Sequence, residues 1–111
     1  MIYHITHKKD WDKAIAENSY KPESLQTEGF IHCSPAGKIT DTANNFFKDQ
    51  KDLVLIWIDE TKVNCKIIWE DLYGHDFKFP HIYGELNPVA VTKVTEFKPG
   101  TNGKYVLPEG I

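Results

Sequence analysis

The chain has 111 residues and a formal net charge of −3 at pH 7, which fits a single domain over residues 1–111 and gives no overall positive field for a nucleic-acid backbone. All 13 basic residues are lysine, so bidentate clamping of phosphate by arginine is excluded. The first residues show no leader pattern, no apolar run is long enough to cross a membrane, and Cys33 and Cys65 form no Cys-x-x-Cys motif. We therefore expect a cytoplasmic protein with reduced thiols and neither a nucleic acid nor a membrane as its partner.

Two helix patterns and two short strand patterns make up the first half of the chain. Trp11, Ala14 and Ile15 have the spacing of one helix face. Ser34-Pro35 is typical of a helix start, because serine is a good N-cap and proline suits the first helical position. The second helix is expected to bury Ile39, Ala43, Phe46 and Phe47. The expected elements are a strand over residues 2–6, a helix over 10–18, a strand over 30–33 and a helix over 34–48.

Strand patterns dominate the second half of the chain. Residues 53–58 are apolar throughout, which predicts a central strand covered on both faces. Further strands are expected over residues 66–70, 89–97 and 105–107, and residues 82–84 are expected to form a short strand or a bend. The sum is an α+β fold, in which two main helices pack against a twisted, mostly antiparallel sheet of short strands.

Three histidines are each followed two positions later by a hydroxyl side chain, with an apolar residue between them. Residues i and i+2 of a strand point to the same face, so each pair should share a polar face while Ile5, Cys33 and Ile82 point to a core. Imidazole can act as an acid, a base, a ligand or a hydrogen-bond partner near neutral pH. The alternative for each residue is structural: a histidine satisfied by a carbonyl group, or a tyrosine that only packs. The candidate pairs are His4 with Thr6, His32 with Ser34 and His81 with Tyr83.

Two further features could serve an anion or a developing cation. A helix that begins at Ser34 would offer backbone N–H groups to a phosphate, although helix capping competes for the same hydroxyl. Glu70 ends an apolar strand, where a carboxylate could stabilise a developing cation or simply be solvated. Three histidines and a carboxylate can also form a zinc site, but the chain lacks a metal-ligand spacing such as His-Glu-x-x-His, and we assign no metal ligand.

Several segments, taken together, resemble the bacterial family known as domain of unknown function 952. The match covers nearly the whole chain, and its most specific piece is Glu28-Gly29-Phe30-Ile31-His32-Cys33-Ser34. The other matching pieces are Tyr3-His4-Ile5-Thr6, Trp11, Tyr20-x-Pro22-x-Ser24-Leu25, Ala43-Asn44-x-Phe46-Phe47, Asp52-Leu53-Val54-Leu55 and Phe79-Pro80-His81-Ile82-Tyr83-Gly84-x-Leu86-Asn87. The resemblance implies a fold like that of the ADP-ribosyltransferases, a group that includes the RNA 2′-phosphotransferases.

The resemblance also implies roles for individual residues. In that group a first-strand histidine contacts the nicotinamide-side ribose of NAD, and a residue on a following strand supports the nicotinamide or its ribose. His4, with Thr6 beside it, would take the first role, and His32 and Ser34 would occupy the second region. His81 and Tyr83 have no counterpart, and Glu70 is only a candidate for the catalytic glutamate that some members carry. The lack of arginine is a departure from the phosphotransferase branch.

Four functions are compatible with these residues. The first is an ADP-ribosyltransferase-like protein that binds NAD, as a substrate, or a related ADP-ribose compound in a histidine-lined cleft. The others are a non-catalytic module for a nucleotide or another small anion, a metal-dependent enzyme that uses the three histidines, and a structural or partner-binding domain. Whether the protein is an enzyme stays open here, because no carboxylate has an assured place in the site.

Overall fold

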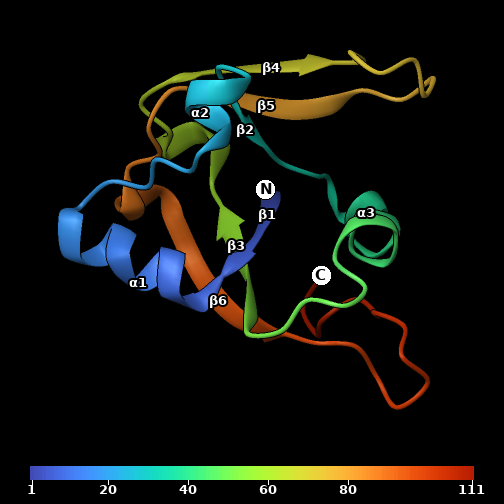
Figure 1. Ribbon diagram of the computed structural model, residues 1–111. Coiled ribbons are helices and arrows are strands. Elements are labelled where there is room, and N and C mark those ends of the chain that lie inside the picture. Colours follow the sequence, from blue (N-terminus) through green and yellow to red (C-terminus); the bar gives the residue numbers. More distant parts are fainter.

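The computed structural model describes residues 1–111 and shows two three-stranded antiparallel sheets with helices around them (Figure 1). The predicted α+β class is confirmed, whereas the single sheet is instead two sheets. The first sheet has the order β1 (Ile2–His7), β3 (Leu53–Ile58) and β6 (Val91–Phe97). The second has the order β2 (Ile31–His32), β5 (Phe79–Tyr83) and β4 (Lys66–Glu70). The helices are α1 (Lys8–Glu17), α2 (Ser24–Thr27) and α3 (Ile39–Phe46).

The central strand of the first sheet, β3, is buried on both faces, as its apolar run predicts, whereas most of the edge strand β6 is exposed. All six residues of β3 are buried. Ile2 and Ile56 pack on one face with Trp11 of α1 and with the inner face of the second sheet. Tyr3 and Leu55 pack on the opposite face with α3 and the C-terminal segment. The two main helices therefore lie on opposite sides of the first sheet (Figure 1).

A backbone bridge at Tyr3 and Ser34 connects the two sheets. Tyr3 of β1 and Ser34 form an isolated antiparallel bridge in which each backbone N–H donates to the other residue's carbonyl, at 2.9 and 2.7 Å. Because Ser34 is held in this bridge, it does not cap a helix. The chain instead makes a 3₁₀ turn at Ala36–Lys38 before α3 begins at Ile39. The prediction that the helix starts at Ser34 is therefore wrong.

Three other expectations differ from the structure. Phe46 and Ile15 are exposed by 70% and 55%, because α3 ends at Phe46 and α1 faces the core through only Trp11 and Ala14. Residues 105–107 form no strand, since Tyr105 is bound to α3: its N–H donates to Asn44 Oδ1 and its hydroxyl donates to the carbonyl of Phe47. None of the helices combines the length and the apolar character needed to cross a membrane.

Candidate functional site

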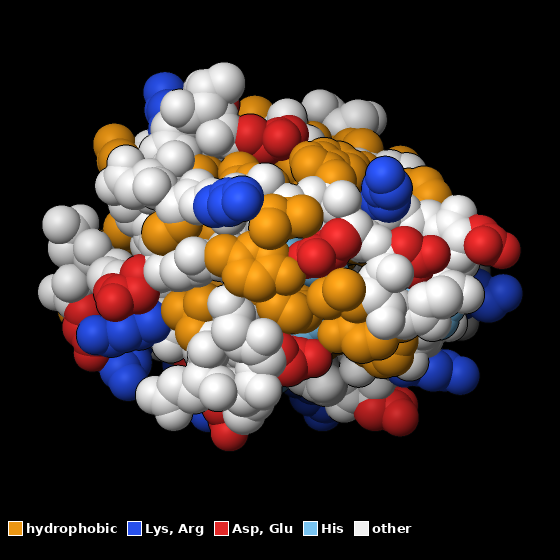
Figure 2. All heavy atoms as spheres, turned by 90° about the horizontal axis from the view of Figure 1, so that it is seen from above, with side chains coloured by type: hydrophobic (Ala, Val, Ile, Leu, Met, Phe, Trp, Pro, Cys, Tyr) orange, Lys and Arg blue, Asp and Glu red, His pale blue; other side chains and the backbone are white.

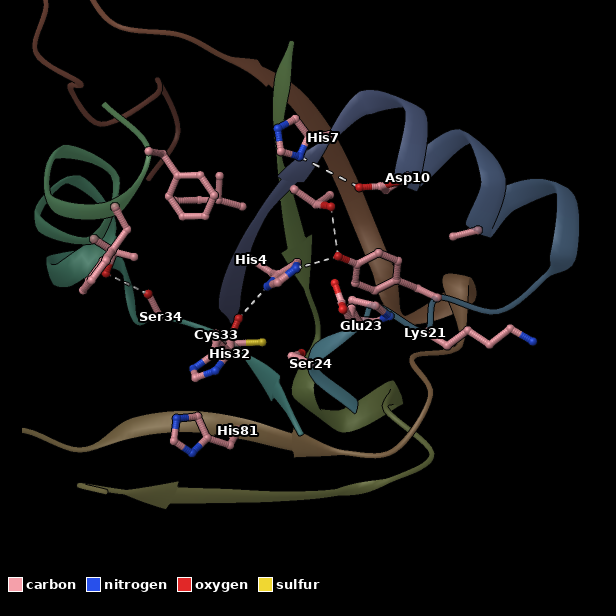
Figure 3. Close-up of a pocket in the computed structure, with 18 of the residues that line it drawn as sticks. His4, His7, Asp10, Lys21, Glu23, Ser24, His32, Cys33, Ser34 and His81 are labelled. Carbon is pink, nitrogen blue, oxygen red and sulfur yellow. Dashed lines mark hydrogen bonds and ion pairs between the residues drawn. The ribbon is translucent and has the colours of Figure 1, made fainter. Parts of the chain in front are cut away.

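A cleft of about 1050 Å³ opens between the first sheet, the second sheet and α3 (Figure 3). Its lining comes from β1, α1, residues 19–24, β2, α3, the connection between β4 and β5, and β5 itself. The predicted site residues that line it are His4, Thr6, His32, Ser34 and His81. Glu70 and Tyr83 do not line the cleft, and they contact it only through His81.

His4 and Thr6 share a face of β1, as the alternation predicts, and Tyr20 joins them. The Tyr20 hydroxyl lies 2.7 Å from His4 Nε2 and 2.9 Å from Thr6 Oγ1. The second ring nitrogen of His4, Nδ1, lies 2.5 Å from the backbone carbonyl of His32. Both ring nitrogens of His4 are therefore bound within the protein.

This geometry fixes the protonation state of His4. A carbonyl can only accept, so Nδ1 carries the proton and Nε2 accepts from the Tyr20 hydroxyl. Tyr20 has a single hydroxyl proton, and the Thr6 hydroxyl therefore donates to Tyr20. Burial lowers the pKa of His4 from 6.5 to about 4, and the His32 carbonyl offsets only part of that effect. His4 is a neutral, fully hydrogen-bonded ring at neutral pH.

His81 has a different set of partners, on the face of the second sheet opposite to the buried Ile82. Its Nδ1 lies 2.8 Å from Glu70 Oε2, and the Tyr83 hydroxyl donates to the same carboxylate oxygen. The bond from Tyr83, and after it the bond from His81, holds the pKa of the Glu70 carboxyl below its usual range, while the carboxylate raises the pKa of Tyr83 to about 12. Phe30 stacks on the His81 ring, with centroids 4.1 Å apart.

His32 repeats this arrangement nearer to solvent. Its Nε2 lies 2.6 Å from Glu28 Oε2, and the Tyr73 hydroxyl donates to Glu28 Oε1 at 3.0 Å. The bond to His32 is the main cause of the lowered pKa of the Glu28 carboxyl. The His32 side chain is 42% exposed, whereas that of His81 is 2% exposed. Over the second sheet, hydrophobic side chains and carboxylates gather with little histidine surface between them (Figure 2).

The three histidines do not meet at one point. His32 and His81 are opposite each other in the register of β2 and β5, and their ring centroids are 5.4 Å apart. His4 contacts this pair only through the backbone carbonyl of His32. No group of three or more His, Cys, Asp or Glu side chains in the chain is arranged to hold a metal ion. The structure therefore offers no metal centre for the three-histidine hypothesis.

The remaining lining combines hydroxyls, aromatic rings and lysines. The hydroxyls of Ser34 and Thr42 are 3.3 Å apart between β2 and α3. Two exposed aromatic side chains line the cleft, Phe46 of α3 and Tyr73 of the β4–β5 connection. The lysines in the lining are Lys13 and Lys21, each 4.0 Å from Glu17. The cleft therefore has polar groups, rings, two lysines and the three carboxylates of Asp10, Glu17 and Glu23 within one space.

Sequence reasoning missed Tyr20, Glu28 and Phe30 as members of these networks. Tyr20 falls in a segment without periodicity, so only the bridge between Tyr20 and Leu86 brings it under β1. Glu28 had a detectable signal, because it precedes His32 by four residues. Cys33 is buried as predicted, and burial raises the pKa of its thiol.

Comparison with known proteins supplies a family and a set of related structures. The family described as protein of unknown function (DUF952) matches residues 5–94. A crystal structure of protein CC0527 from Caulobacter crescentus has a TM-score of 0.85 and 29% identity, covering 96% of this chain and 93% of that one. A solution NMR structure of CC0527 has a TM-score of 0.84 and 28% identity, with 99% and 95% covered. None of the curated proteins matches the chain.

Proposed function

The chain belongs to the DUF952 family, and we propose that its cleft binds NAD or a related ADP-ribose compound. The proposal follows the resemblance to ADP-ribosyltransferases that the sequence carries. The observation that supports it is the composition of one cleft, in which hydroxyl groups, exposed aromatic rings and lysines occur together. A dinucleotide needs the same three kinds of partner, for its riboses, its rings and its phosphates.

Each part of the ligand has a counterpart in the lining. Ser34 and Thr42 offer hydroxyls to a ribose, and Phe46 offers a ring face to a base. Lys13 and Lys21 supply point charges for a diphosphate, in place of the helix start at Ser34 that the fold does not form. His4 would act on a ribose through the hydroxyls of its network, since both of its ring nitrogens already have protein partners.

Turnover would require cleavage of the bond between nicotinamide and ribose, whose transition state carries positive charge on the sugar. Glu70, the sequence candidate for the stabilising carboxylate, lies behind His81 and outside the lining. Glu70 therefore does not contact a ligand in the cleft directly, and a second candidate function is a module that binds a nucleotide without converting it. The two functions predict the same ligand and differ in the release of nicotinamide.

A titration of the isotope-labelled protein with NAD and with ADP-ribose tests the proposal. We expect amide shifts confined to the cleft. Replacement Phe46→Ala should weaken binding at least about fivefold, because stacking of a base on an aromatic side chain contributes ~1–3 kcal/mol. Val89→Ala is the matched control, since Val89 is 75% exposed and lies outside the cleft. The absence of shifts at millimolar ligand would overturn the proposal, and a nicotinamide assay separates the enzyme from the binding module.

A further inference from the structure

His81 has one ring nitrogen held by a carboxylate and the other without a protein partner. Glu70 has a lowered pKa and is an ionised acceptor at neutral pH, so the Nδ1 of His81 carries the proton that joins them. A neutral imidazole has one N–H, and Nε2 is then left with its lone pair. Carboxylate and imidazole in this arrangement form the pairing that orients a general base.

The free nitrogen of His81 faces the cleft. No hydrogen bond within the protein reaches Nε2, yet every fully buried side-chain nitrogen or oxygen has a partner. Nε2 must therefore touch accessible space, and His81 lines the cleft. Its ring projects from β5 toward His32 (Figure 3). Phe30 stacks on one ring face and Glu70 holds Nδ1, so the direction of Nε2 is set before any ligand arrives.

The other two histidines are less suited to accept a proton. The lone pair of His4 Nε2 is occupied by the Tyr20 hydroxyl. His32 has the same kind of carboxylate partner as His81, but its side chain and that of Glu28 are 42% and 39% exposed. An exposed pair is solvated and loosely held, whereas a buried and stacked ring keeps its geometry. Among the three histidines, His81 alone combines a free lone pair with a fixed direction.

We propose that His81 is the general base of the cleft, that Glu70 and Tyr83 position it, and that the group it deprotonates is a hydroxyl of water or an alcohol. This inference rests on the proposed function. A base is needed only for a nucleophile that must lose a proton, so the arrangement selects hydroxyl acceptors over anionic ones such as carboxylates.

The step balances without a further reactant. The bond between the ribose C1 and the nicotinamide nitrogen breaks, and its electron pair leaves with neutral nicotinamide. The acceptor oxygen forms a new bond to C1, and its proton passes to Nε2 of His81. The Glu70 carboxylate then faces an imidazolium, which it stabilises as a charge-assisted hydrogen-bond partner. Release of the proton to water restores the neutral ring.

The experiment combines NAD affinity by NMR titration with single-turnover release of nicotinamide in the full chain. We expect His81→Gln to retain NAD affinity within about threefold and to lower the release rate at least about 100-fold, in line with the usual contribution of general acid–base catalysis. Azide should restore release in this variant and form the glycosyl azide, because an anionic nucleophile needs no base. A variant that only disturbed packing would not respond to azide.

If His81→Gln does not fold, Glu70→Gln still tests the proposal. Glu70 is partly exposed and glutamine has nearly the same shape, so this variant is expected to fold. We expect a smaller loss of release with unchanged affinity, and loss of the fixed Nδ1–H form of His81 in ¹⁵N spectra. Glu28→Gln is the matched control and should leave that form intact. Normal release in His81→Gln, or NAD binding by the wild type without release, would overturn the role of His81 and leave the proposed binding standing. Failure of NAD to bind would instead overturn the proposed function.

Discussion

His4 and His81 both lie in a strand and are both followed two residues later by a hydroxyl side chain, yet their surroundings differ. His4 has neutral partners on both ring nitrogens, a carbonyl and a tyrosine hydroxyl. His81 has a carboxylate on one nitrogen and an open position on the other. The partners of an imidazole, more than the local motif that contains it, therefore determine what it can do.

The largest expected effect concerns the pH dependence of the His4 region. The unfolded chain binds a proton at His4 near pH 6.5, whereas the folded chain binds it only near pH 4. The stabilisation is thus complete above pH 6.5 and is lost as the pH falls toward 4, by on the order of 3 kcal/mol. Urea denaturation at several pH values measures it, with His4→Gln as the control that lacks this loss. A free energy of unfolding that does not change between pH 6.5 and pH 4 would contradict the neutral, buried state assigned to His4 and with it the comparison with His81.

A smaller loss is expected when the hydroxyl that closes the His4 network is removed. Tyr20→Phe leaves His4 Nε2 without its donor and the Thr6 hydroxyl without its partner. We expect the free energy of unfolding to fall by about 1–3 kcal/mol, the usual cost of an unsatisfied buried group. Thermal or urea unfolding provides the measurement. Tyr73→Phe is the matched variant, because the Tyr73 hydroxyl donates to the exposed Glu28. An equal loss of stability in both variants would contradict the comparison between the buried and the exposed histidine networks.

The smallest effect belongs to the exposed His32 pair. Glu28→Gln removes the charge that faces His32 while keeping the size of the side chain. Because surface ion pairs contribute little, we expect the free energy of unfolding to change by less than about 1 kcal/mol. Urea unfolding at pH 7 tests this. A loss as large as that of Tyr20→Phe would mean that the second sheet depends on this pair as the first sheet depends on the His4 network.

Local patterns in the sequence predicted much of the fold. The all-apolar run of residues 53–58 has the bounds of β3, and β4 has the predicted bounds of residues 66–70. The alternation in β1 correctly placed His4 and Thr6 on one face. These successes share a cause: burial and strand periodicity act on neighbours in the chain.

The site depended on long-range contacts that such patterns do not contain. Ser34 has every feature of an N-cap, but pairing with Tyr3 uses its backbone groups. His32 and His81 are neighbours only because β2 and β5 pair in one particular register. Tyr20 becomes part of the His4 network through the bridge to Leu86. Tertiary pairing therefore decided which polar residues meet, after local preference had chosen their elements.

The bridge between Tyr3 and Ser34 makes opening of the cleft measurable by amide hydrogen exchange. These two amides donate to each other's residue across the junction of the sheets, beside the bond from His4 to the His32 carbonyl. If the two sheets separate, both amide protons become free to exchange with solvent. The exchange rates of the Tyr3 and Ser34 amide protons therefore report how often the cleft opens, without any label or added probe.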